Sequence, residues 1–320
     1  MSDNKIVKIN FSGFWDNNDK EHNLITELLR QEFEPVIDDH PDYLFYSVFS
    51  DEYINYPEDT VRIFFSGESQ IPDFNLCDYA MGFDWISFGD RYERVPLYLF
   101  YPGTSRMSSD RGGMLKTPVR KDEFCSFVCS NAEGDCKRIQ LFHELSKYRK
   151  VDSGGKFENN VGGPVQDKIA FESMHRFSIC FENASYPGYT TEKILQSFAA
   201  GTIPIYRGDP EICRVFNPKA FINANEYDDM AELAKYIIDF DNDEDRFIFM
   251  LKEDPFNQGW SIEEQRDRAG EFIRSVFRQD KAQAFRRNRT FRGRNYERFF
   301  KHYLNVNMKL RKMKKFIKRK

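Results

Sequence analysis

The chain has 320 residues and a net charge of −4, a length suited to two domains of about 120 to 160 residues each. It is rich in aromatic residues, with 32 Phe, 16 Tyr and 3 Trp; most of these belong in cores, although aromatic clefts also suit sugars. No apolar run reaches the roughly 18 residues that a membrane span needs, and the segment MSDNKIVKINF lacks the apolar core of a secretory signal. Composition therefore excludes a membrane-spanning protein and predicts a cytoplasmic one.

The six cysteines form no C-x-x-C pair, and a cytoplasmic chain keeps its thiols reduced, so we expect small core residues rather than disulfides. Cys125, Cys129 and Cys136 are close enough in sequence to suggest zinc. No histidine stands at ligand spacing from them, which argues against a metal site.

The first part of the chain predicts an α/β domain. Strand patterns and one helical pattern alternate, and Val61–Phe65 is a continuous apolar run typical of a strand buried on both faces of a parallel sheet. The predicted strands are Ile6–Phe11, Tyr43–Phe49, Val61–Phe65 and Cys77–Trp85, and the predicted helix is Glu21–Phe33.

Glu68 follows the predicted buried strand after Ser66 and Gly67. Ligands of open α/β sheets bind at the carboxyl ends of the strands, so a carboxylate there is a candidate general base. An ordinary solvated loop glutamate is the alternative.

Residues 101–122 interrupt these patterns with many Gly, Ser and Pro residues. The segment predicts an interdomain linker, and it also suits a mobile loop over a cleft.

The second part of the chain repeats the α/β pattern. Arg138 stands at the start of one predicted helix, where the helix dipole disfavours a cation, so it is either a ligand-binding residue or a surface arginine. The loop 151–164 is rich in Gly and Asn, as in loops that approach ligands closely and in plain connectors. The predicted strands are Phe124–Cys129, Phe177–Phe181, Ile203–Tyr206 and Ala220–Asn223, and the helices include Ile139–Tyr148, a helix starting near Thr191 and Asp228–Ile238.

Lys193 is the most informative residue of this part. It lies in the first turn of a helix that Thr190 or Thr191 is expected to cap and Gly201 to end. A cation there opposes the helix dipole and predicts a compensating anion, such as a bound phosphate. An exposed lysine screened by Glu192 is the alternative, and Arg138 at a second helix start favours a diphosphate site.

The acidic run Asp239–Asp245 contains the Asp-x-Asp spacing that holds metal in many sugar transferases. It follows a helix rather than a strand, so we interpret it as a solvated charged face. The late helix predicted at Gly259–Phe277 is long enough to cross back onto the first domain.

The chain ends in a basic segment. Its residues from Lys281 onward contain 16 Lys and Arg and one acid, Glu297, a net charge of +15, so the first 280 residues carry −19. Val306, Leu310, Met313 and Ile317 form one apolar helical stripe among basic residues, a pattern typical of helices on anionic membranes. Nucleic acid binding and a solubilising tail are the alternatives.

The segments CFENASYPGYTTEK (180–193) and AGTIPIYRGDP after it closely resemble the donor-site motif of the α-1,3/1,4-fucosyltransferases. FFSGES (64–69), CDYAMGFDWISFGDRYERVPLY (77–98), FVCSN (127–131) and VDSGGKFENNVGG (151–163) resemble the same family in the same order. The resemblance implies a GT-B fold, two Rossmann-like domains facing across a cleft. We place the acceptor domain at residues 1–120, the GDP-fucose domain at 121–280 and a basic amphipathic tail at 281–320.

The resemblance also implies the site residues. The family's catalytic base falls on Glu68, and its donor-binding residues fall on Asn183, Tyr189, Glu192 and Lys193. Its phosphate-binding arginine falls on Arg138, with Lys137 as a competitor because the preceding loop differs in length from the family pattern.

The implied reaction is a single inverting displacement that moves L-fucose from GDP-β-L-fucose to GlcNAc or Glc of Galβ1,4-linked acceptors, giving Lewis X-type surface glycans. No cofactor or essential metal is expected, because Arg138 and Lys193 would neutralise the diphosphate. α-1,4 transfer, another GDP-sugar donor, and a non-enzymatic nucleotide- or lipid-binding regulator are the alternatives.

Unlike the animal members, which have a Golgi membrane span and disulfides, the chain resembles the soluble or peripheral bacterial type. This implies a location at the inner face of the cytoplasmic membrane, with residues 306–320 on the anionic lipid and no nucleic acid partner. Some bacterial members carry heptad repeats before a basic tail; no such repeat is found here, so dimerisation stays open.

Overall fold

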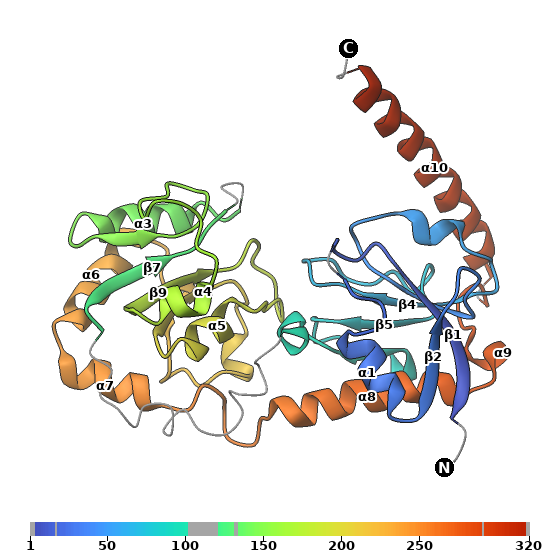
Figure 1. Cartoon of the computed structure of the whole chain (residues 1–320), viewed down its shortest axis with the longest axis horizontal. Coiled ribbons are helices and arrows are strands. Elements are labelled where there is room, and N and C mark those ends of the chain that lie inside the picture. Colours follow the sequence, from blue (N-terminus) through green and yellow to red (C-terminus); the bar gives the residue numbers. More distant parts are fainter. Residues whose placement is uncertain (1–3, 17, 102–120, 131–133, 290, 318–320) are drawn as a thin grey trace. The chain divides into compact units, whose positions relative to one another are not determined.

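The computed structural model describes residues 4–16, 18–101, 121–130, 134–289 and 291–317 (Figure 1). The chain divides into two compact units, the first unit of Met1–Val95 with Arg266–Lys320 and the second unit of Pro96–Gln265. The predicted linker 101–122 lies almost entirely outside the described residues.

The first unit contains a six-stranded, fully parallel sheet in the order β2-β1-β3-β4-β5-β6. The strand order reverses between β1 and β3, which makes their carboxyl ends the expected ligand-binding edge. β4 lies between β3 and β5 and is buried throughout, as its apolar run predicts. The strands are β1 Lys5–Ser12, β2 Phe33–Ile37, β3 Tyr43–Tyr46, β4 Val61–Phe65, β5 Tyr79–Gly82 and β6 Tyr92–Arg94.

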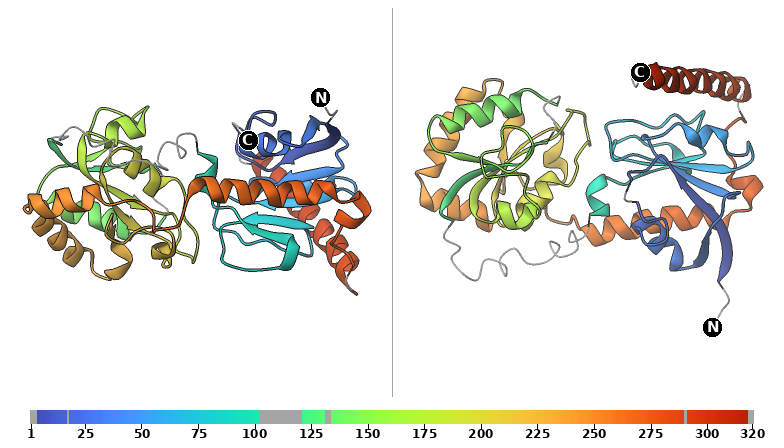
Figure 2. Two further views of the ribbon diagram at one scale, coloured as in Figure 1. Left: turned by 90° about the horizontal axis from the view of Figure 1, so that it is seen from below. Right: turned by 45° about the horizontal axis from the view of Figure 1, so that its top comes forward.

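Different helices cover the two faces of this sheet, because side chains alternate between faces along each strand. On one face, Tyr43 of β3 stacks on Phe277 of α8 (Ile262–Arg278), with ring centroids 4.1 Å apart. On the other face, Leu44 of β3 shares a core with Leu304 of α10 (Gly293–Ile317). Figures 1 and 2 show α8 and α10 on opposite sides of the strands.

The late helix does cross back onto the first unit, as its sequence position suggests, but the crossing comes earlier than expected. The sequence places the second domain's end near residue 280, whereas the chain rejoins the first unit at Arg266. Apolar packing and ion pairs both hold α8 there; Arg278 contacts Glu32 beside α1 (Leu24–Arg30), and Phe272 packs edge-on against Tyr79.

The second unit contains a five-stranded parallel sheet in the order β11-β10-β9-β7-β8, which again reverses next to its first strand. Leu141 of α3 and Ile237 of α6 pack in one core cluster with Phe127 and Ile179 of the sheet. The strands are β7 Glu123–Phe127, β8 Val151–Ser153, β9 His175–Phe181, β10 Ile203–Arg207 and β11 Ile222–Asn223. The helices are α3 Lys137–Ser146, α4 Lys168–Glu172, α5 Lys193–Ala199, α6 Met230–Asp241 and α7 Glu244–Lys252. Two Rossmann-like units, as the family resemblance implies, are therefore confirmed.

Three edge strands, β2, β6 and β8, were not predicted. β2 contains Pro35, which an edge strand tolerates, and its short alternating pattern adjoins the helical pattern expected to run to Phe33. β8 spans three residues at the start of the segment predicted as a loop. β6 also spans only three residues, and all three strands are too short for a clear period-two signal.

The acidic run Asp239–Asp245 is not a uniformly solvated face. Asp241 is largely buried and pairs with Arg176, whose Nε lies 2.8 Å from its Oδ1. Asp243 caps α7 by accepting from the Arg246 amide at 3.0 Å. The run therefore attaches β9 to a helix start, a tertiary role that its spacing does not reveal.

The core prediction holds for four of the cysteines, Cys77, Cys125, Cys129 and Cys180, which are buried and free. It is wrong for Cys136 and Cys213, which are exposed. None of the helices in the described part of the chain combines the length and apolarity needed to cross a bilayer.

A buried network of ion pairs attaches the C-terminal part of the chain to the sheet of the first unit. Glu297 of α10 lies 2.7 Å from Nη1 of Arg62 in β4 and 3.5 Å from Nε of Arg287. Arg287 also pairs with the buried Asp78, whose carboxylate accepts from the backbone amides of Arg62, Arg286 and Arg287 at 2.7 Å each. Burial would raise the pKa of the Glu297 carboxyl, but Arg62 and Arg287 hold it below its usual value.

We expect Glu297→Gln to lower the free energy of unfolding by about 3 kcal/mol at pH 7, because the buried Arg62 loses its carboxylate partner and Arg287 keeps only Asp78. The pKa of Glu297 is depressed in the folded state, so its stabilisation exists above the unfolded pKa of about 4.3 and is lost as pH falls through the folded value. The difference between the variant and the parent should therefore shrink below about pH 4.

Urea unfolding at pH 7 and pH 3.5 measures both effects. Glu27→Gln on the exposed side of α1 is the control and should stay within about 0.5 kcal/mol of the parent. Equal midpoints for the two variants at pH 7 would contradict the role of the network.

Candidate functional site

The loop between β9 and α5 folds around a buried carboxylate. Glu182 follows the last residue of β9, and its carboxylate accepts from the Thr191 amide at 2.8 Å and the Thr191 hydroxyl at 2.6 Å. Lys193 Nζ donates to the same carboxylate at 2.9 Å. A buried carboxylate needs such partners, so Glu182 draws the end of the loop back to the strand.

Asp209, which follows β10, holds the middle of the same loop. Its buried carboxylate accepts from the Gly188 amide at 2.8 Å and from the Thr190 hydroxyl at 3.2 Å. It also accepts from the Glu211 amide at 2.8 Å, which fixes its own turn. Two carboxylates at the ends of neighbouring strands thus determine the conformation of the polar loop.

The structure changes the interpretation of Lys193. The predicted compensating anion is a side chain of the protein, because Lys193 Nζ lies 2.9 Å from Glu182 and 3.7 Å from Glu192. Burial alone would lower the pKa of the Lys193 ammonium, but the two carboxylates raise it above its usual value, so the lysine stays protonated. The predicted threonine cap is wrong: α5 begins at Lys193 after Glu192, since Thr190 and Thr191 donate to the two carboxylates instead.

Arg138 and Asn183 come together although 45 residues separate them. Nη1 of the buried Arg138 donates to Oδ1 of Asn183 at 3.2 Å, which joins the start of α3 to the β9 loop. Lys137, the competing candidate, forms an ion pair with Asp228 at 3.3 Å. Of the two cations, Arg138 is therefore the one in contact with a predicted site residue.

Tyr189 and Glu192 complete the predicted group in the second unit. Tyr189 is buried and its carbonyl oxygen accepts from the Tyr206 hydroxyl at 3.5 Å. Burial would raise the pKa of the Glu192 carboxyl, whereas Lys193 and Lys168 hold it below its usual value, so Glu192 remains ionised beside the lysine.

Sequence reasoning missed three residues that shape this site, namely Glu182, Asp209 and Tyr101. Burial and the charge of Glu192 raise the pKa of the Tyr101 phenol to about 12, and its side chain hydrogen-bonds to Glu192. Glu182 carried a usable signal, because it follows a central strand just as Glu68 does. Tyr101 lies 91 positions before Glu192 in the sequence and offered none.

In the first unit, Glu68 lies just beyond the end of β4, as predicted, and is partly exposed. Its backbone amide donates to the Ser66 hydroxyl at 3.0 Å, and its carbonyl oxygen accepts from that hydroxyl at 2.8 Å. This local turn presents Glu68 at the carboxyl edge of the sheet, where a general base is expected.

Aromatic rings gather at the same edge. Phe14 and Trp15 follow β1 and are partly exposed, and both rings contact Phe65 of β4, with centroids 5.9 Å and 6.5 Å apart respectively. Gly13 makes the turn between the strand and these rings possible, since its φ is +68° and an added Cβ would lie 2.6 Å from the Ser47 carbonyl oxygen.

The loop 151–164 uses its glycines and asparagines for its own packing. An added Cβ at Gly155 would lie 2.0 Å from the Cys129 carbonyl oxygen, so this close backbone approach requires glycine. The Asn160 side chain accepts from the Ser153 amide and donates to the Val151 carbonyl oxygen, both within the segment. These contacts fit the connector alternative.

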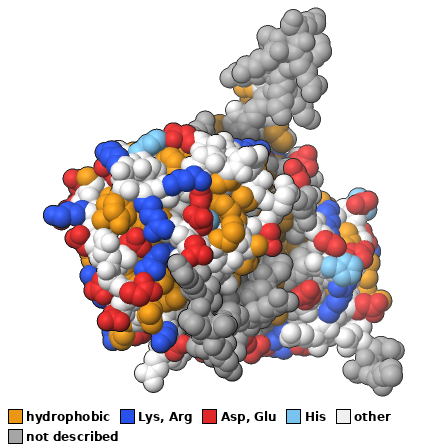
Figure 3. All heavy atoms as spheres, turned by 60° about the vertical axis from the view of Figure 1, so that its left-hand side comes forward, with side chains coloured by type: hydrophobic (Ala, Val, Ile, Leu, Met, Phe, Trp, Pro, Cys, Tyr) orange, Lys and Arg blue, Asp and Glu red, His pale blue; other side chains and the backbone are white. Residues whose placement is uncertain are grey.

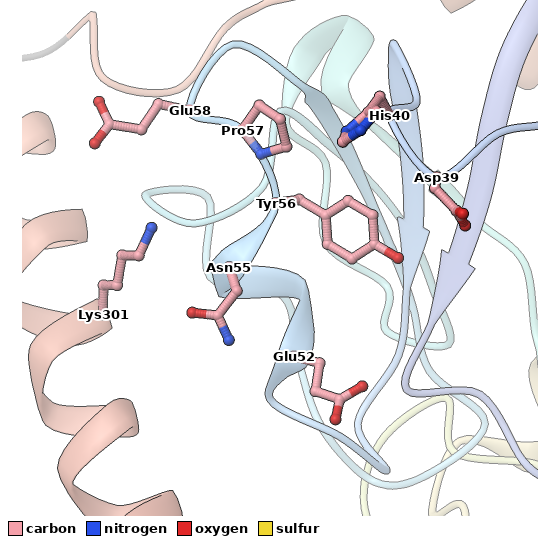
Figure 4. A pocket seen from close by; sticks show the side chains of 8 residues that line it. All are labelled: Asp39, His40, Glu52, Asn55, Tyr56, Pro57, Glu58 and Lys301. Atoms are coloured by element: carbon pink, nitrogen blue, oxygen red, sulfur yellow. The ribbon is translucent and has the colours of Figure 1, made fainter.

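The first unit also has an open pocket of about 720 Å³, at the amino ends of β3 and β4 and therefore at the edge opposite Glu68 (Figure 4). Tyr56 lies at its centre, and Lys301 of α10 points toward it from one side. Carboxylates of Asp39, Glu52 and Glu58 line the rest together with His40, Asn55 and Pro57. The pocket contains none of the predicted site residues.

Glu182→Gln should destabilise the protein by about 3 kcal/mol, because an amide cannot accept from both Thr191 and Lys193 as a carboxylate does and leaves the lysine with only the more distant Glu192. Thermal and urea unfolding measure the change. Glu211→Gln is the matched control, since its pair with Arg214 is exposed and contributes about 0.5 kcal/mol. Adding Lys193→Met to Glu182→Gln should restore part of the lost stability. Equal stability of Glu182→Gln and Glu211→Gln would contradict the proposed contact.

Two family models match the chain, one in each unit. Residues 9–101 match the family model described as Alpha-(1,3)-fucosyltransferase FucT N-terminal domain. Residues 118–264 match the model of Glycosyltransferase family 10 (fucosyltransferase), C-terminal part. The first range covers most of the Glu68 sheet, and the second contains Arg138, Asn183, Tyr189, Glu192 and Lys193.

Among curated proteins, an alpha-(1,3)-fucosyltransferase of Helicobacter pylori is 34% identical over 227 residues, which cover 61% of this chain and 47% of that protein. The human 4-galactosyl-N-acetylglucosaminide 3-alpha-L-fucosyltransferase 9 is 30% identical over 132 residues, covering 40% of this chain and 36% of the relative. The chain thus spans less than half the length of these two curated relatives.

Solved structures give the same result over a larger part of the chain. A crystal structure of an alpha1,3-fucosyltransferase with GDP-fucose is similar with a TM-score of 0.68 and 26% identity, covering 85% of this chain and 92% of that one. A structure with GDP has a TM-score of 0.73 and 25% identity, covering 87% and 92%. With both units matched in sequence and in fold, the chain belongs to glycosyltransferase family 10, the fucosyltransferase family.

Proposed function

We propose that this protein is an inverting α-1,3-fucosyltransferase that moves L-fucose from GDP-β-L-fucose to GlcNAc or Glc of Galβ1,4-linked acceptors. The observation that carries the proposal is the group of Arg138, Asn183 and Lys193 around one polar loop. A buried arginine and a partly buried lysine there suit a diphosphate, and structural relatives were solved with GDP-fucose and with GDP.

The donor would bind in the second unit. Lys193 and Arg138 would stabilise the charge that grows on the departing diphosphate, which is the role a metal has in other transferases. Asn183, Tyr189 and Glu192 would hold ribose, phosphate and fucose hydroxyls in position. Glu182 already neutralises Lys193 in the free protein, so a diphosphate would share the lysine with that carboxylate.

The acceptor would bind in the first unit. Glu68 would take the proton of the acceptor hydroxyl as its oxygen attacks the anomeric carbon and GDP leaves from the opposite side. One displacement converts the β-linked donor into an α-linked product, so no covalent nucleophile is needed. The partly exposed rings of Phe14 and Trp15 at the same edge support this placement, because sugar rings pack on aromatic faces.

The basic tail would place the enzyme on a membrane. We propose that residues 306–320 bind the anionic inner face of the cytoplasmic membrane, where surface glycans of the Lewis X type are assembled. The support is charge, since Glu297 is the single acid among the residues from Lys281 to the end.

Lys193→Ala should weaken GDP binding roughly 10- to 100-fold, because it removes one charge-assisted contact to a phosphate. Isothermal titration calorimetry with GDP measures it. Lys137→Ala is the control, because Lys137 pairs with Asp228 in the parent protein. The affinity of this variant for GDP should stay within about threefold of the parent value. Unchanged affinity in a folded Lys193→Ala protein would exclude the phosphate role.

Glu68→Gln should lower kcat by roughly 10²- to 10⁴-fold while leaving GDP affinity unchanged, because it removes the base but keeps the shape of the side chain. Initial rates with GDP-fucose and N-acetyllactosamine measure the change, and Glu58→Gln in a loop at the opposite sheet edge should match the parent. Near-parental turnover of Glu68→Gln would remove the assigned base.

NMR of the product distinguishes α-1,3 from α-1,4 linkage, and a shift in melting temperature with another GDP-sugar alone would indicate a different donor.

A further inference from the structure

The exposed apolar residues of α10 begin well before the basic tail. Between Tyr296 and Met313 they recur at intervals of three and four residues, and each is between 39% and 69% exposed. These residues are Tyr296, Phe299, Tyr303, Val306, Leu310 and Met313. The sequence pattern had indicated only the second half of this set, which we call the α10 stripe.

The first half of the α10 stripe belongs to the folded first unit. Glu297, between Tyr296 and Phe299, makes the buried ion pairs with Arg62 and Arg287. Leu304, directly after Tyr303, enters the core beside Leu44. Three and four residue steps keep the stripe on one side of the helix over roughly 26 Å. The α10 stripe therefore runs without interruption from the part of α10 that packs on the first unit to the basic end of the helix.

We propose that the whole α10 stripe, including Phe299 and Tyr303, contacts the lipid surface, so that the membrane touches the first unit itself and fixes its orientation. This inference rests on the proposed membrane contact of residues 306–320 and extends it to the docked part of the helix. Tyr and Phe suit this place, because aromatic rings favour the membrane interface.

Charge complementarity favours lipid as the occupant. Arg298, His302 and Lys309 are exposed and lie along one side of the stripe at helical spacing. Glu297 is the single acid of α10, and it is buried against Arg62 and Arg287. By contrast, the face of the second unit drawn in Figure 3 shows Lys and Arg mixed with Asp and Glu.

The acidic pocket beside α10 does not oppose this contact. Lys301, which points toward the pocket, is two residues from Phe299 and from Tyr303, roughly 200° round the helix. The carboxylates of Asp39 and Glu58 therefore lie on the side of the helix away from the stripe.

A second copy of the chain is the competing occupant, because steps of three and four residues also suit a coiled coil. Two such helices side by side would bring Arg298, Lys309 and the basic residues after it close to their own copies. Like charges at these positions oppose pairing, whereas an anionic bilayer neutralises them.

Tryptophan quenching tests the proposal on the full chain. Phe299→Trp, Leu310→Trp and the control Phe249→Trp are each mixed with phosphatidylglycerol vesicles whose acyl chains carry bromine. Phe249 lies on α7 in the second unit and is 62% exposed, so it matches Phe299 in kind and exposure. We expect the added tryptophan to be quenched at positions 299 and 310 and unaffected at 249.

The outcomes distinguish the membrane contact of residues 306–320 from that of the docked part of α10. Quenching at 310 alone would overturn this inference and leave the tail as the membrane contact, whereas quenching at neither position would overturn both. In parallel, Phe299→Ser should weaken vesicle partitioning roughly tenfold, and Phe249→Ser should leave it unchanged. If sedimentation without lipid shows that Phe299→Ser converts a dimer to a monomer, the stripe is a self-association surface and the lipid proposal fails.

Discussion

The buried carboxylate of Glu182 is the interaction on which the site in the second unit depends. It has almost no contact with water, so it must be satisfied by protein donors, and it finds them in Thr191 and Lys193. This requirement bends the β9–α5 loop back over the strand end. The same contact keeps Lys193 charged although its side chain is mostly shielded from water. A protonated lysine is thus held in a fixed position at the end of the loop.

The first unit also depends on buried carboxylates, which here pair with two buried arginines. Asp78 and Glu297 gather Arg62 and Arg287, and the backbone amides around Arg287 turn toward Asp78. These contacts attach the C-terminal part of the chain to the sheet that begins it. Because α8 covers one face of that sheet and α10 the other, the unit is complete only with residues from both ends of the chain.

The two units divide the chemistry between them. Glu68 and the rings of Phe14 and Trp15 lie at the carboxyl edge of the first sheet. Arg138, Asn183 and Lys193 lie at the corresponding edge of the second. In both units, regular strands fix the positions of these loop residues at the carboxyl edge, which is where open α/β sheets generally bind their ligands.

The sequence was sufficient for the buried strands and for Glu68, because a run such as Val61–Phe65 has few alternatives to a central parallel strand. It was insufficient for the edge strands β2, β6 and β8, whose short patterns carry little periodicity. It also misassigned the cap of α5, since Thr191 prefers a buried carboxylate to its own helix. The residues next to a side chain in the sequence do not show whether it hydrogen-bonds to the local backbone or to a distant residue.

By itself, then, the sequence determined two α/β units, the carboxylate after β4 and a lysine that requires a negative partner. Only the tertiary structure decided that this partner is Glu182, that Arg138 rather than Lys137 meets Asn183, and that α10 carries an exposed stripe from Tyr296 onward. The physical reason is common to all three. Hydrophobic periodicity is local and survives in the sequence, whereas ion pairing and exposure depend on which distant residues the fold brings together.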